Sequence, residues 1–184
     1  MHRGTLNEDT LKEEIRFKDE YPERINLLFV PVNSGPGVAR NVALDNCDAE
    51  YVTMLDSDDA ISTDYIYELY SLIKKTDTDM VICGNQLINE DTGEINSSPN
   101  KELLVSGYYP YVLRGSAFRL IKKEKLDRYN IRYPESTLLE DMAFVEYCNI
   151  MIEKKVSTDI NGYMVYYHSD STSNSTLYRQ CSRN

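Results

Sequence analysis

The chain has 184 residues, of which 41% are hydrophobic and 27% are charged, which is the composition of an ordinary folded domain and not of a disordered segment. Its net charge of −10 excludes a general nucleic-acid binder, because neutralising a phosphate backbone takes a surface rich in Lys and Arg. The same charge disfavours binding to anionic membranes, but it is compatible with a small anionic ligand that is held through a divalent cation.

The cysteines indicate neither a zinc site nor a disulfide framework, because they are far apart and form no C-x-x-C pair. They are Cys47, Cys83, Cys148 and Cys181. No apolar run approaches the roughly 18 residues of a membrane span, and no signal-peptide pattern is visible. We therefore expect a cytoplasmic protein in a reducing compartment, with a peripheral position at the inner face of a membrane as the alternative.

The first predicted elements are two helices and an apolar strand. Residues 10–20 form a helix pattern with a weak apolar stripe. Residues 25–32 (INLLFVPV) are a nearly continuous apolar run, which is typical of a strand buried on both faces. The breaker-rich loop at 33–37 is followed by a second helix over 38–46.

Two more strands follow, with a helix between them. Residues 51–55 predict a buried strand that ends in an acidic run, and residues 80–83 predict another. Ser62 or Thr63 is expected to cap the intervening helix. Its predicted core face has three residues at helical spacing: Ile66, Leu69 and Ile73. The alternation of strand and helix indicates an α/β domain with parallel pairing.

Beyond residue 84 the pattern is looser. Residues 89–101 are rich in turn formers and predict an exposed hairpin or loop. Residues 138–152 predict a helix, and residues 162–167 (GYMVYY) predict a last strand.

The acidic run after the second strand is a candidate metal site. In open α/β sheets, ligands gather at the carboxyl ends of strands. Asp56 and Asp58 are two residues apart, so in an extended chain they point to the same side. Two carboxylates about 4 Å apart repel by roughly 4 kcal/mol at an effective dielectric constant near 20, and a divalent cation removes that cost. Oxygen ligands of this kind suit Mg²⁺ or Mn²⁺.

The acidic run at residues 56–59 also has interpretations other than a metal site. A solvated turn with a helix-capping Asp is the commoner explanation of an isolated D-x-D-D. An EF-hand loop is disfavoured by Ala60 and Ile61, which stand where an acid or Asn and then Gly are needed. A phosphatase D-x-D-x-T pattern would also need Thr at position 60. Arg40 stands where a dinucleotide-binding G-x-G-x-x-G would place its third Gly.

Three motifs together resemble a known family. They are residues 33–41 (NSGPGVARN), residues 56–59 (DSDD), and Glu140-Asp141 after residues 132–135 (RYPE). Their order and spacing, from roughly residue 25 to residue 173, resemble the inverting family-two glycosyltransferases of GT-A fold. The resemblance implies an α/β, GT-A-like (Rossmann-like), mostly parallel sheet flanked by helices.

The resemblance also implies roles at the donor side of a site. Asp58 would hold the Mn²⁺ or Mg²⁺ that bridges the nucleotide diphosphate, and Asp56 would face the ribose or the donor sugar. Arg40 would contact the nucleotide, although a surface arginine on a helix is the alternative. Asn41 and Ser57 complete the implied donor-binding set.

Asp141 is implied as the general base that deprotonates the acceptor hydroxyl, with Glu140 and Asp59 in supporting positions. A helix N-terminal acid, favoured by the macrodipole, is the alternative for Asp141. His168 is a candidate third metal ligand, although a lone His is more often a satisfied polar group. A Ser/Thr patch near the donor site is matched weakly by Ser171, Thr172 and Ser173.

The implied partners are a nucleotide-diphosphate sugar, with a UDP-sugar favoured, and a glycan or lipid-linked acceptor in surface polysaccharide or cell-wall glycan synthesis. We expect one domain over 1–184, with 1–24 unassigned, 25–84 on the donor and metal side, and 85–184 on the acceptor side. An inactive remnant that acts as a binding or assembly module is the alternative. A generic Mg²⁺-dependent phosphate-binding domain is a third hypothesis.

The family's first strand, a helix and a second strand ending in D-D-G-S have no counterpart in the sequence. In the family sheet these strands would lie between those expected at 25–32 and 51–55. We therefore expect a chain truncated at its N-terminal side, with exposed strand edges that a homo-oligomer could cover.

Overall fold

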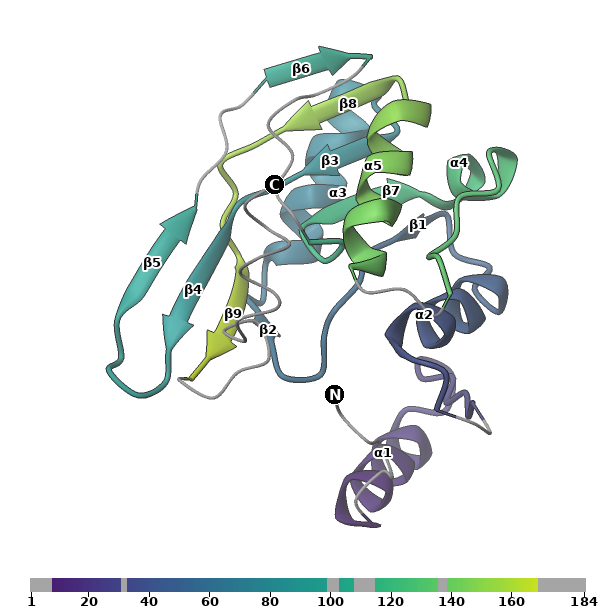
Figure 1. Ribbon diagram of the computed structural model, residues 1–184, viewed down its shortest axis with the longest axis vertical. Helices are drawn as coiled ribbons and strands as arrows, with labels where there is room; N and C mark the ends of the chain where they lie inside the picture. The colour runs from purple at the N-terminus through teal and green to yellow at the C-terminus, as the bar shows by residue number, and fades with distance from the viewer. Residues whose placement is uncertain (1–7, 31–32, 99–102, 108–114, 136–138, 169–184) are drawn as a thin grey trace. The chain divides into compact units, whose positions relative to one another are not determined.

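The structure is a computed structural model that describes residues 8–30, 33–98, 103–107, 115–135 and 139–168 (Figure 1). The chain forms two compact units, each assembled from two segments. The first unit comprises Met1–Cys47 and Tyr133–Leu138, and the second comprises Asp48–Arg132 and Leu139–Asn184.

The first unit contains two helices, α1 (Glu8–Glu20) and α2 (Pro36–Asp45), and both were predicted. α1 has no buried side chain, and its exposed ion pairs contribute little to its stability. α2 begins two residues earlier than expected, because Pro36 suits the first helical turn and Gly35 before it has φ of 89°.

The strand predicted at residues 25–32 is wrong for the part that the structure describes. Residues 25–30 form no strand, and Leu28 and Phe29 are 37% and 58% exposed. Residues 31 and 32 lie outside the described residues. A strand needs a neighbour to take its backbone hydrogen bonds, and no described segment pairs with this run. Local apolarity alone was therefore not enough to form the strand.

The second unit contains two sheets. The first has the order β1-β7-β3-β8-β6, with strands β1 (Tyr51–Val52), β7 (Arg119–Lys122), β3 (Met80–Ile82), β8 (Lys154–Ser157) and β6 (Leu103–Ser106). The second has the order β2-β9-β4-β5, with strands β2 (Ala60–Ile61), β9 (Tyr163–Tyr167), β4 (Asn85–Asn89) and β5 (Ile95–Ser98).

The α/β class is confirmed, but the predicted parallel majority is not. Of the seven strand pairings among the described residues, five are antiparallel. The parallel pairs are β3 with β8 and β4 with β9. Because β4 follows β3 and β9 follows β8 along the chain, the same two segments form the parallel centre of both sheets (Figure 1).

Helix α3 (Tyr65–Thr76) packs on one face of the first sheet. Its buried side chains recur at every fourth position: Tyr65, Leu69 and Ile73. They join a core cluster with strand residues that include Val81, Leu120 and Val156. Asp77 ends the helix in a left-handed conformation with φ of 49°, and Lys74 and Lys75 favour the last turn electrostatically.

Two details of the α3 prediction were wrong. Tyr65 takes the core position expected of Ile66, which is 42% exposed. The N-cap is Asp64, without a capping side-chain hydrogen bond, whereas Ser62 contributes only its carbonyl, which accepts from the Tyr65 amide at 3.1 Å. The pairing of β2 with β9 fixes the position of the segment that precedes α3. This tertiary contact therefore sets where the helix begins, without a capping side chain.

The buried strand predicted at 51–55 is confirmed only over two residues, of which Val52 is buried, and it is the edge strand of its sheet. The strand at 80–83 is confirmed as β3, whose three side chains are buried. Within the hairpin or loop expected at 89–101, the structure has a turn with Gly93 at φ of 72° and then β5, whereas its partner strand β4 begins earlier, at Asn85.

The later helix and the last strand are confirmed as α5 (Glu140–Met151) and β9, each slightly shorter than expected. The predicted elements did not include β2, β6, β7, β8 or α4 (Lys123–Arg128), and they included only the last residue of β4. None of the helices in the described part of the chain combines the length and the hydropathy that a membrane-spanning helix requires.

Candidate functional site

The aspartates of the candidate site follow β1 in a loop that we call the aspartate loop. It consists of Asp56, Ser57, Asp58 and Asp59. β1 and β3 both run antiparallel to β7, and β8 is parallel to β3. β1, β3 and β8 therefore run in the same direction. The loop therefore lies at the edge where their carboxyl ends meet, which is where α/β sheets bind ligands.

A buried tyrosine of β9 anchors this loop. The Tyr163 hydroxyl donates to Asp59 Oδ2 at 2.7 Å and accepts from the Asp56 amide at 3.2 Å. The Tyr166 amide donates to Asp59 Oδ1 at 3.3 Å, and the Asp59 amide closes a turn on the Asp56 carbonyl at 3.1 Å. The sequence analysis missed Tyr163, because it lies 104 residues beyond Asp59 in the chain.

The carboxylates of the loop differ in exposure. Asp58 is exposed, whereas Asp56 and Asp59 are half-buried. Burial raises the pKa of Asp59, hydrogen bonds from Tyr163 and Tyr166 lower it, and the neighbouring carboxylates raise it again. Asp59 therefore has a mainly structural role at the base of the loop, and Asp58 is the carboxylate that faces solvent.

The metal expected at this loop can be tested against its donor atoms. Among the described residues, no three His, Cys, Asp or Glu side chains lie together in a group that could hold a metal ion. The loop still offers the hard oxygen ligands of Asp56 and Asp58, and Mg²⁺ is usually bound by one or two carboxylates together with substrate phosphates. These residues fit a metal that arrives with a diphosphate, and not one that protein ligands hold alone.

His168 follows β9 and is exposed. Because β2 and β9 are antiparallel with Ala60 opposite Met164, β9 continues past the start of β2 on the side of the aspartate loop, where the Tyr166 amide contacts Asp59. Its role as a third ligand stays a prediction. The Ser/Thr patch at residues 171–173 lies outside the described residues.

Glu140 and Asp141 occupy the first turn of α5 and are half-buried. The helix covers the sheet face opposite α3. Cys148 in α5 lies near Arg119 and Lys155, whose charges oppose the rise that burial causes in the pKa of its thiol, and these two residues alternate with the strand residues that face α3. That Asp141 shares a cleft with the aspartate loop stays a prediction.

In the first unit, two motif residues of α2 are brought together on Tyr133. The Asn41 side chain donates to the Tyr133 carbonyl at 2.9 Å and accepts from its amide at 2.8 Å. The Arg40 guanidinium lies 5.3 Å from the centre of the Tyr133 ring, which is a cation–π distance. Asn41 is 8% exposed, so its amide holds the backbone of the R-Y-P-E segment, a structural role that the sequence analysis missed.

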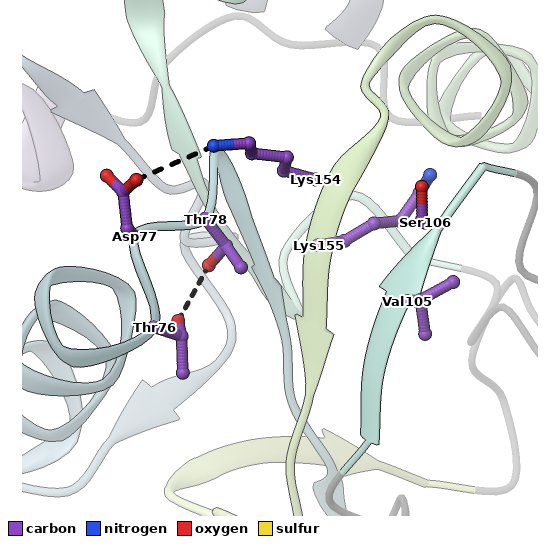
Figure 2. A pocket seen from close by; sticks show the side chains of 7 residues that line it. All are labelled: Thr76, Asp77, Thr78, Val105, Ser106, Lys154 and Lys155. Carbon is purple, nitrogen blue, oxygen red and sulfur yellow. Dashed lines mark hydrogen bonds and ion pairs between the residues drawn. The ribbon is translucent and has the colours of Figure 1, made fainter.

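A pocket of about 250 Å³ lies at the strand ends of the first sheet that are opposite to the aspartate loop (Figure 2). Its lining comes from residues 76–78 before β3, from the start of β8 and from the end of β6, so it lies at the amino ends of β3 and β8. Lys154 forms an ion pair with Asp77 at 3.5 Å, and Figure 2 marks this pair with a dashed line. The pocket is therefore separate from the aspartate loop, which lies at the carboxyl ends of β1, β3 and β8.

Comparison with known proteins gives consistent results. The family described as "Glycosyl transferase family 2" matches residues 7–146, which is more than half of the chain. The putative glycosyltransferase EpsH of Bacillus subtilis is 26% identical in an alignment of 151 residues that covers 76% of this chain and 41% of EpsH. The putative teichuronic acid biosynthesis glycosyltransferase TuaG of B. subtilis is 29% identical over 83 residues, which are 45% of this chain and 33% of TuaG.

A solved structure of S. aureus TarS 1-349 in complex with UDP-GlcNAc superimposes with a TM-score of 0.69 and 19% identity, over 89% of this chain and 49% of the TarS chain. The chain thus spans about half or less of the proteins that it matches. The likeness to TarS confirms the GT-A-like fold, and with the family match it shows that this chain belongs to glycosyl transferase family 2.

Proposed function

We propose that this chain acts in the transfer of a hexosyl group from a nucleotide-diphosphate sugar to an acceptor hydroxyl with inversion, on the cytoplasmic side of surface polysaccharide or cell-wall glycan synthesis. The observation that carries the proposal is the aspartate loop, which presents Asp58 to solvent at the ligand-binding edge of a family-two fold. A UDP-sugar donor is supported by the UDP-GlcNAc bound to TarS, and a cell-wall glycan acceptor is supported by the name of TuaG.

In this proposal each carboxylate has a separate task. Asp58 and Asp56 provide oxygen ligands at the diphosphate of the donor, and Asp59 secures the loop through Tyr163. Asp141 accepts the proton of the acceptor hydroxyl as its oxygen bonds to the anomeric carbon and the bond to the diphosphate breaks. Glu140 supports Asp141 in the first turn of α5, where the helix macrodipole favours negative charge.

A bound Mn²⁺ or Mg²⁺ would supply Lewis-acid stabilisation of the departing diphosphate. Asp58 and Asp56 would hold it together with phosphate oxygens, and His168 is the further candidate ligand. Ser57 is a candidate for contact with the nucleotide, the contact expected of Arg40 stays a prediction, and Asn41 would act through the backbone that it holds.

The test is titration calorimetry of UDP in the presence and absence of Mn²⁺. We expect binding that requires the metal, and we expect Asp58→Asn to weaken it on the order of a hundredfold, because a charge-assisted metal contact is lost. Asp48→Asn is the matched control, since Asp48 is an exposed carboxylate outside the loop and should leave the affinity unchanged. Equal affinity of the Asp58 and Asp48 variants would contradict the proposed site.

The second candidate function is a non-catalytic binding or assembly module. It is favoured because both polar groups of the Asn41 side chain are hydrogen-bonded to the Tyr133 backbone, so that this motif residue has a structural role. This hypothesis predicts no heat with UDP, with or without Mn²⁺. A generic phosphate-binding domain predicts instead that inorganic pyrophosphate with Mg²⁺ binds as tightly as UDP.

A further inference from the structure

Tyr163 is a core side chain whose hydroxyl group reaches the candidate site. Its ring is fully buried and makes edge-to-face contacts with Tyr65, at 6.1 Å between centroids, and with Phe118, at 5.1 Å. Aromatic pairs of this geometry restrict the orientation of the ring. The hydroxyl therefore has a defined position relative to the sheet.

This hydroxyl contacts both ends of the aspartate loop. It accepts a hydrogen bond from the Asp56 amide and donates one to the Asp59 carboxylate, while the backbone of the same two residues closes a turn. The tip between them consists of Ser57 and Asp58, and both are exposed. A short loop that is fixed at both ends has few conformations for its tip.

We propose that Tyr163 is a positioning residue for donor binding, because its hydroxyl holds the aspartate loop in the conformation that turns Asp58 toward a metal-bound diphosphate. The inference rests on the proposed function. Its physical basis is the entropy of the loop, since a loop that is already ordered need not be ordered by the ligand. Through Tyr163, β9 of the second sheet positions the aspartate loop, which follows β1 of the first sheet.

The experiment compares Tyr163→Phe with Tyr65→Phe in the full chain. Tyr65 is the matched control because it is a fully buried tyrosine of the same core, and its hydroxyl contacts Cys83 Sγ at 3.2 Å and the Ala117 carbonyl at 3.3 Å. Both variants keep the aromatic ring, and circular dichroism with thermal melting verifies the fold. Two quantities are measured: hydrogen exchange of the Asp56 amide by NMR, and affinity for UDP with Mn²⁺.

We expect Tyr163→Phe to speed exchange of the Asp56 amide and to weaken UDP binding with Mn²⁺, each on the order of tenfold, whereas Tyr65→Phe changes neither. Faster exchange with unchanged affinity would overturn the inference and leave the proposed function intact. Lack of UDP binding by the wild-type chain would overturn both. An equal loss of affinity in the two variants would indicate a general effect of the core and would also overturn the inference.

A double-mutant cycle provides a second measurement. If the Tyr163 hydroxyl acts through Asp59, then Asp59→Ala weakens UDP binding with Mn²⁺, and adding Tyr163→Phe to Asp59→Ala causes little further loss. Independent, multiplicative losses in the double variant would show that Tyr163 does not act through the loop anchor and would overturn the inference.

Discussion

Cys83 and Cys148 lie in the core of the second unit, and both are 0% exposed. Burial raises the pKa of the Cys83 thiol to about 11 and that of the Cys148 thiol to about 12, because the thiolate would lose its hydration. The thiolate is the reactive form, so neither residue has the environment of a nucleophile or of a redox site. Their contribution is to packing.

A labelling experiment tests this environment. At pH near 8 we expect iodoacetamide to modify the half-buried Cys47, and to modify Cys83 and Cys148 at least about a hundredfold more slowly, because both thiols are buried and burial disfavours the reactive thiolate. Peptide mass spectrometry measures each site separately. In denaturant the three rates should converge, and rapid labelling of Cys83 or Cys148 in the native protein would contradict the prediction.

At the scale of elements, Gly162 marks the closest approach between the start of β9 and the segment before α3. The Ser62 amide donates to the Gly162 carbonyl at 2.8 Å. A Cβ atom at position 162 would lie 2.5 Å from Ser62 Oγ and 3.0 Å from Tyr65 Cδ2. Glycine is therefore required here by space, and the contact sets the position from which β9 reaches the aspartate loop.

We expect Gly162→Ala to lower the free energy of unfolding by about 1–3 kcal/mol, the usual cost of overpacking a tight contact. Urea denaturation measures the loss. The double variant Ser62→Ala/Gly162→Ala should recover part of it, because the nearest atom is removed while Tyr65 remains in place. A single variant as stable as the wild type would show that β9 shifts without cost.

At the scale of the whole molecule, the apolar run at residues 25–30 exposes large hydrophobic side chains to solvent. Leu28 and Phe29 are exposed in a segment that forms no strand, although its composition favours one. Exposed apolar segments with unpaired backbone groups promote association between chains. A homo-oligomer that covers this run therefore stays a prediction.

Size-exclusion chromatography with light scattering tests that prediction. We expect the wild-type chain to associate as its concentration rises, and Phe29→Ser to shift it toward the monomer with no change in melting temperature. Tyr67→Ser on α3 is the control, because Tyr67 is 73% exposed in a different element. A wild-type chain that stays monomeric at every concentration would contradict the prediction.

The sequence by itself determined the helices that carry an apolar stripe, and it determined the family. Helical periodicity is local, so α2, α3 and α5 were predicted within a few residues of their observed bounds. The motifs at residues 33–41, 56–59 and 140–141 were enough to indicate a family-two glycosyltransferase, which the family match confirms. The acidic residues of the candidate site were visible because they are adjacent in the chain.

Only the tertiary structure decided which segments pair and which side chains support the site. The run at 25–30 has the composition of a strand but no described partner, and β7 pairs antiparallel with both β1 and β3. The contacts of Tyr163 with Asp59 and of Asn41 with Tyr133 join residues 104 and 92 positions apart. Such contacts depend on how the whole chain packs, because hydrogen bonds between distant segments leave no periodic pattern in either one.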